Sequence, residues 1–268
     1  MIEQFTFHQL LRWLHIFFGF VGLVAFWMPV FAKKGGRFHI RAGWVFVTCA
    51  YVVGVSAVVS CVWALVDPRG FAQLPPDLGA DVVARVSGEL RFFFGLLAVL
   101  GLGVVSAVET GIPVLRTRRQ PEKLDSTRRR AVYLLMGAGA ASLLAFGIWH
   151  LANGDSRYGI WVGIGALILA DARGAWRHMK NPLPTPMAWW YCHMETMLGA
   201  GIAFHTAFAV FGSGRLLGFR PEGALALLPW VLPSLIGVPA ISIWVRHYKR
   251  KFGELQASRS SPAPSVAR

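Results

Sequence analysis

The sequence predicts an all-α, polytopic membrane protein built as a bundle of seven transmembrane helices. Hydrophobic residues make up 55% of the 268-residue chain and charged residues only 15%, whereas a soluble domain carries roughly a quarter charged residues. Seven apolar stretches are each long enough, at about 20 residues, to cross the hydrocarbon core of a bilayer as a helix. They lie near residues 10–32, 42–66, 92–112, 131–152, 158–176, 187–211 and 224–245.

The connections between these stretches contain the residues that form turns and end helices. The first two stretches flank "KKGGRFHIR", whose glycines permit a tight turn and whose cations anchor two helix ends, which predicts an antiparallel hairpin. "DPRGFAQLPPDLGAD" is rich in proline and aspartate and breaks the helix before the third stretch. "RHMKNPLPTPM" holds three prolines and gives the sixth stretch a clean start.

The last stretch and the tail differ in composition from the rest. Pro229, Pro233 and Pro239 fall inside the seventh stretch and predict a kinked or interrupted helix. The tail is rich in serine, proline and alanine and is predicted to be disordered. The chain is therefore divided into a seven-helix transmembrane domain, residues 1–254, and a disordered cytoplasmic tail, residues 255–268.

The distribution of positive charge predicts the orientation in the membrane. Twenty of the 27 Lys and Arg residues fall in the segments 33–41, 114–131, 173–180 and from 246 onward. All four segments lie on one side of the predicted bundle, which by the positive-inside rule is the cytoplasmic side. The N-terminus is then outside and the C-terminus inside. The basic run "RTRRQPEKLDSTRRR" is interpreted as a topology determinant beside anionic lipid, and no nucleic-acid partner is expected.

Two blocks of sequence resemble a known family. The first, "LHIFFGFVGLVAFWMPVFAKKGGRFHIRAGWVF", has a histidine opening a span, a Lys-Gly-Gly turn, and a second histidine followed by a glycine in the next span. The second is "HMETMLGAGIAFHTAFAVF". Both are similar to the bacterial membrane proteins of the family called domain of unknown function 2306, through His15, Lys34, Gly35, Gly36, His39 and Gly43, and then His193, Met197, Thr206, Ala207 and Phe208. The resemblance implies a multi-pass protein of the bacterial inner membrane and no particular activity.

Three histidines make the outer half of the bundle the leading candidate site. At 1.5 Å per residue, His15 and His205 both fall about 9 Å outside the midplane, and His150 about 13 Å outside it. Such histidines could be axial ligands of a haem b, ligands of a copper or zinc ion, or part of a quinone site in a redox-linked protein. The alternative is that each is a neutral imidazole hydrogen-bonded to a neighbouring helix. Glu89 and Arg91 lie at a similar or shallower depth.

A second group of ionisable residues lies in the inner half. His193 and Glu195 fall about 9 and 6 Å inside the midplane on the sixth stretch, and Asp171 lies at a similar level on the fifth. Ionisable groups inside a membrane are costly and are functional candidates for that reason. These three, with Glu89 and Arg91, could form the proton or ion pathway of a small transporter. His193 and Glu195 are about 200° apart on a helix and cannot bind one ion together.

Several other activities are not supported by the sequence. It contains no His-Glu-x-x-His motif of zinc proteases, no Gly-x-Ser-x-Gly elbow and no phosphate-binding loop. The seventh stretch lacks the lysine that a retinal Schiff base requires. A structural or accessory subunit, whose polar residues only lock helices together, remains the third hypothesis. The expected partners are the lipid bilayer, a small-molecule ligand and a membrane partner subunit.

Overall fold

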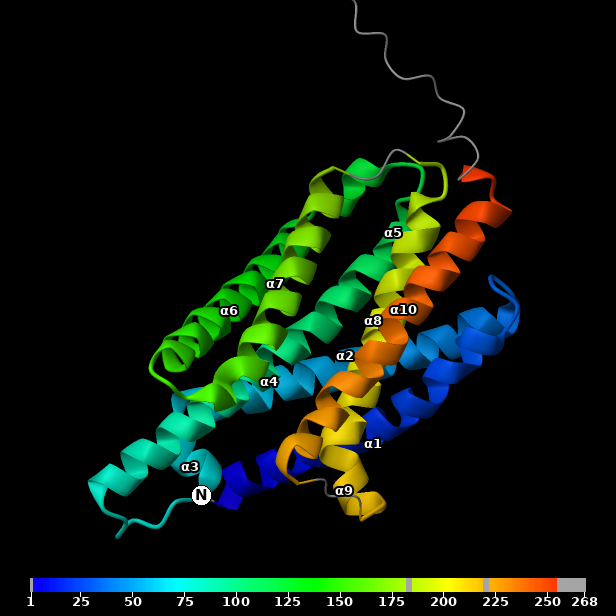
Figure 1. Cartoon of the computed structure of the whole chain (residues 1–268). Helices are drawn as coiled ribbons and strands as arrows, with labels where there is room; N and C mark the ends of the chain where they lie inside the picture. The colour runs from blue at the N-terminus through cyan, green and yellow to red at the C-terminus, as the bar shows by residue number, and fades with distance from the viewer. Residues whose placement is uncertain (1, 182–184, 219–221, 255–268) are drawn as a thin grey trace, which may run out of the picture.

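The computed structural model describes residues 2–181, 185–218 and 222–254, and these residues form helices and turns without any β-strand (Figure 1). The helices occur in the order α1 (Ile2–Phe31), α2 (Arg37–Val66), α3 (Pro68–Ala72), α4 (Ala80–Gly111), α5 (Pro113–Arg116), the 3-10 helix η1 (Pro121–Leu124), α6 (Thr127–Ala152), the 3-10 helix η2 (Ser156–Tyr158), α7 (Gly159–Lys180), α8 (Ala188–Ala207), the π-helix η3 (Phe208–Gly212), α9 (Ser213–Leu216), the 3-10 helix η4 (Gly223–Leu227) and α10 (Leu228–Lys251).

Six helices in the described residues are long and apolar enough to cross a membrane, which supports a multi-pass membrane protein. They are Phe7–Phe31, Arg37–Val66, Ala80–Arg116, Thr127–Ala152, Ala188–Leu216 and Leu225–Lys251. Helix α7 is the seventh long helix and lies beside α6 in the bundle (Figure 1). It is not among the six, and its second half contains Asp171 and Arg173. The number of crossings therefore stays a prediction at seven, as does the orientation.

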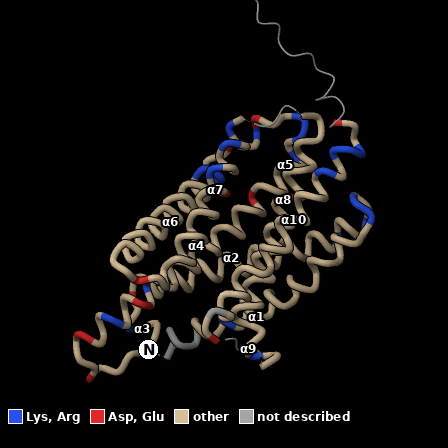
Figure 2. Tube along the Cα trace, viewed as in Figure 1, with Lys and Arg blue, Asp and Glu red and all other residues tan. Residues whose placement is uncertain are grey.

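Charged residues separate along the bundle axis. Figure 2 shows Lys and Arg gathered at the end that contains α5, the α1–α2 turn and the C-terminal ends of α7 and α10. The other end, near α3 and the start of α4, carries acidic residues interspersed with fewer basic ones (Figure 2). We call the basic end the inner end and the opposite end the outer end, in keeping with the predicted orientation.

The turn between α1 and α2 follows from its glycines. Gly35 adopts a positive φ of 75°, a conformation that costs glycine little and other residues more. The amide of Gly36 then donates to the carbonyl oxygen of Lys33 at 3.0 Å, and α2 begins at the next residue. The antiparallel hairpin predicted for these two helices is confirmed, since α1 packs along α2.

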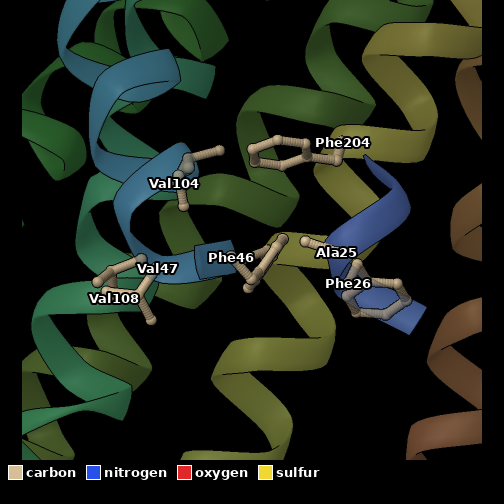
Figure 3. Close-up of a cluster of buried hydrophobic side chains, with 9 residues drawn as sticks. Ala25, Phe26, Phe46, Val47, Val104, Val108 and Phe204 are labelled. Atoms are coloured by element: carbon tan, nitrogen blue, oxygen red, sulfur yellow. The ribbon is translucent and has the colours of Figure 1, made fainter. Parts of the chain in front are cut away.

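Small residues bring the central helices into close contact. A Cβ atom at Gly54 of α2 would lie 3.2 Å from the carbonyl oxygen of Gly101 on α4, so the two backbones touch there. Beside this contact, α1, α2, α4 and α8 share one hydrophobic core, which includes Phe26, Phe46 and Phe204 (Figure 3). A second core joins α4 to α6, around Leu96, Val99, Ala140 and Leu143. Helices α1, α2, α4 and α8 thus pack closely together, and α6 and α7 lie on one side of them.

Of the kink or interruption predicted for the seventh stretch, the structure excludes an interruption of its main helix. Helix α10 runs without interruption from Leu228 to Lys251 although Pro233 and Pro239 lie inside it. The irregular helix is instead the end of α8, which continues as the π-helix Phe208–Gly212. The predicted disordered tail, residues 255–268, lies outside the described residues.

Candidate functional site at the inner end

His205 uses both ring nitrogens within the chain. Its Nδ1 lies 2.7 Å from the carbonyl oxygen of Gly201, which can only accept, so Nδ1 carries the proton. Its Nε2 then accepts a hydrogen bond from Trp27 Nε1 at 3.2 Å. The imidazole is therefore neutral and satisfied, with no lone pair left for a metal ion.

His15 of α1 contacts α2, and it lies at a different level of the bundle from His205. Its Nδ1 is 3.1 Å from Ser56 Oγ, and because that hydroxyl donates to the carbonyl oxygen of Val53, His15 is the donor. Since His205 contacts Trp27, twelve residues farther along α1, the two histidines are separated by roughly 18 Å of helix. The estimate of equal depth assumed parallel helices, whereas α1 and α8 cross.

His150 has its own surroundings at the outer end. Its ring stacks on Tyr158, with ring centroids 4.1 Å apart, and it also contacts Phe146. The structure therefore does not bring His15, His150 and His205 together. No group of three or more His, Cys, Asp or Glu residues among residues 2–181, 185–218 and 222–254 could hold a metal ion. The geometry gives no support to a shared haem, metal or quinone site in the outer half.

The other outer candidates are separate as well. Glu89 and Arg91 are both exposed on α4, and the described residues contain no ion pair between them. Arg91 Nε instead donates to the carbonyl oxygen of Leu65 at 3.1 Å. That carbonyl belongs to the last turn of α2, where no helical amide is available to pair with it. Arg91 thus caps a helix.

The three inner candidates do not contact one another. His193 Nδ1 lies 2.8 Å from the carbonyl oxygen of Gly111 on α4. Glu195 and Asp171 have no hydrogen bond or ion pair within the described part of the chain, and both are exposed on their helices. The electrostatic neighbours of Glu195 are Lys249 and Cys192. A pathway through these residues stays a prediction that no contact supports.

A buried polar network at the inner end joins three helices. The side chain of Glu109 is 5% exposed and accepts from Tyr51 Oη of α2 and from Arg128 NH2 of α6, each at 2.5 Å. Arg129 Nε donates to the Glu109 carbonyl oxygen at 2.9 Å. Glu109 lies near the end of the third apolar stretch, residues 92–112, where a carboxylate can reach water, so hydropathy alone does not reveal its burial. The network fixes α2, α4 and α6 relative to one another.

A second set of polar contacts lies at the α1–α2 turn. Lys34 Nζ donates to the carbonyl oxygens of Pro29 at 2.9 Å and Val30 at 2.5 Å, which lie in the last turn of α1. His39 Nδ1 lies 3.1 Å from the same Pro29 oxygen. Lys34 and His39 therefore hold the end of α1 in place, and His193 lies at this same end of the bundle.

An open groove of about 440 Å³ lies beside this turn. Its walls are Val30 and Lys34 on one side and Ile243, Trp244, His247 and Tyr248 of α10 on the other. Lys34 Nζ is 5.8 Å from the centre of the Trp244 ring. Partial burial lowers the pKa of Lys34 from its ordinary value, and no ion pair to this lysine is found in the described part of the chain. The groove thus combines a partly dehydrated cation with two aromatic rings.

Comparison with known proteins adds no assignment to this geometry. No protein-family model, no curated protein and no solved structure matches the chain.

Proposed function

We propose that the chain is a multi-pass protein of the bacterial cytoplasmic membrane, with its N-terminus outside and its C-terminus inside, that binds an anionic amphiphile in the groove between α1 and α10. The observation that carries this proposal is Lys34. Its ammonium group is partly buried, lines an open groove, and lacks a carboxylate partner in the described residues. A partly dehydrated, unneutralised cation favours an anion as its partner.

The surroundings of Lys34 favour a lipid-like anion over a small soluble one. Trp244 and Tyr248 are the aromatic types that concentrate at the level of lipid headgroups. Ile243, which also lines the groove, is 64% exposed, and Phe31, which follows Val30 at the end of α1, is 80% exposed. The acyl chain of a phospholipid would lie along these apolar side chains, and the phosphate group of the same lipid would contact Lys34 and His247. Basic pockets between transmembrane helices on the cytoplasmic side are a recurrent form of anionic lipid site.

The Lys34→Met variant should lose bound anionic lipid. The purified protein, reconstituted with phosphatidylglycerol and phosphatidylcholine, is compared with the variant by native mass spectrometry, which counts the lipids retained per chain. A lysine at the membrane surface contributes about 1 kcal/mol, or about fivefold in affinity. Lys33→Met is the matched control, because Lys33 is exposed, carries the same charge and does not line the groove.

Three further results complete this test. Phosphatidylcholine retention should not depend on Lys34, and His247→Leu should weaken phosphatidylglycerol binding in the same direction. Inorganic phosphate at millimolar concentration should not displace the lipid; displacement would point to a site for a free anion. Equal retention of phosphatidylglycerol by the Lys34 and Lys33 variants would contradict the proposal.

A further inference from the structure

Two histidines from distant parts of the sequence are oriented as metal ligands usually are. His39 Nδ1 lies 3.1 Å from the Pro29 carbonyl oxygen and His193 Nδ1 lies 2.8 Å from that of Gly111. A carbonyl oxygen only accepts, so in both neutral rings Nδ1 carries the proton and Nε2 keeps its lone pair. Metal-binding histidines are oriented in this way, with one nitrogen held by a carbonyl and the other facing the metal.

The supports of the two rings both lie next to residues that border one hydrophobic core. Val30, the neighbour of Pro29, and Ile112, the neighbour of Gly111, both pack against the core shared by α1, α2, α4 and α8. The two imidazoles are close enough for the charge of one to act on the other. His39 of α2 and His193 of α8 are therefore within electrostatic reach of each other, although they are more than 150 residues apart in the sequence.

A thioether lies beside the same two helices. Met197 follows His193 by four residues, so both side chains lie on one face of α8. A Cβ atom at Gly111 would lie 2.6 Å from Met197 Cε, which places Met197 against the glycine whose carbonyl holds His193. Met197 also packs against the shared core. Two imidazoles and one thioether thus lie on helices that pack against one core at the inner end of the bundle.

We propose that His39 Nε2, His193 Nε2 and Met197 Sδ bind a monovalent copper ion. Imidazole and thioether are ligands that copper accepts, and the thioether favours Cu(I) over harder ions. The three side chains carry no negative charge, and Lys34 lies near enough to His39 to interact with it electrostatically. Both features favour a monovalent ion over a divalent one. The site uses none of the groove residues and does not depend on the lipid proposal.

The test is an anaerobic titration of the purified full-length protein with Cu(I), in competition with a chromophoric Cu(I) chelator. The wild type should bind about one Cu(I) per chain. His39→Ala, His193→Ala and Met197→Leu should each weaken binding by about tenfold or more, since even indirect supports of a metal site commonly contribute that much. Met197→Leu nearly conserves volume and is therefore the variant least expected to disturb folding.

Two control variants and one control metal make the result specific. Met194→Leu removes a thioether on another face of α8, and Lys34→Met alters the groove; both should bind Cu(I) as the wild type does or more tightly. Zn(II) should bind weakly and should be little affected by Met197→Leu. The proposal is overturned if the wild type binds no Cu(I) above a detergent blank, or if the three ligand variants bind as tightly as Met194→Leu.

Discussion

The Gly201→Leu variant is expected to show the largest loss of stability of any single substitution in α8. A Cβ atom at Gly201 would overlap three carbons of the Phe26 ring, which is 7% exposed and belongs to the core shared by α1, α2, α4 and α8 (Figure 3). Phe26 cannot withdraw because its ring also packs on Phe46 and His205. Overpacking a filled core costs about 1–3 kcal/mol or more, and a leucine adds three carbons beyond Cβ.

Gly199→Leu is the matched control for this variant. A Cβ atom at Gly199, two residues away on the same helix, would meet no other atom within 4 Å. Thermal unfolding in mild detergent, followed by size-exclusion chromatography with fluorescence detection, compares the two. We expect a marked fall in midpoint and in monodisperse protein for Gly201→Leu only. Similar midpoints for the two variants would show that α1 and α8 do not cross as described.

The second large effect is expected at the buried carboxylate of the inner end. Glu109→Ala removes the acceptor shared by Tyr51 and Arg128, and so it removes hydrogen bonds that link α4 to α2 and α6. Arg128 is 69% exposed and can turn to water, so the cost comes mainly from the unpaired Tyr51 hydroxyl and the lost packing. Leaving a buried polar group unsatisfied costs about 1–3 kcal/mol.

A second acidic residue on α4 provides the control for this prediction. Glu89 is exposed and has no ion pair within the described residues, so Glu89→Ala should leave the unfolding midpoint unchanged. Glu109→Gln keeps a carbonyl oxygen that can accept from Tyr51 and should fall between the wild type and Glu109→Ala. If urea titration gives the same unfolding free energy for Glu109→Ala and Glu89→Ala, the network does not hold the three helices together.

The helical architecture could be predicted from hydropathy, but helix ends could not. The first and third apolar stretches were expected near residues 10–32 and 92–112, whereas α1 begins at Ile2 and α4 at Ala80. Both helices begin before their apolar stretches, in segments that contain charged residues such as Arg85 and Glu89. A search for apolar stretches does not detect such segments. Cys49, Cys61 and Cys192, which all fall inside apolar stretches, are buried as small core residues.

The candidate site was harder to predict because it depends on how helices cross. Depth along each helix predicts that His205 lies level with His15. Because α8 crosses α1 near Phe26 and Trp27, His205 instead accepts a hydrogen bond from Trp27. Conversely, His39 lies near the end of the predicted turn "KKGGRFHIR", where a side chain is expected to reach water. Only the positions of the Pro29 and Gly111 carbonyls show that His39 and His193 are held in the same way.

The orientation of the bundle is the claim on which both proposed sites depend, since each lies at the basic end. The three native cysteines are buried, so single cysteines added to the wild type can report topology through a membrane-impermeant maleimide. Asp77→Cys and Asn153→Cys should be labelled in intact cells, and Arg119→Cys and Asn181→Cys only after permeabilisation. Labelling of Asn181→Cys in intact cells would mean that α7 does not cross the membrane. The reverse pattern at all four positions would contradict the account, because it would place the groove and the two histidines at the outer face.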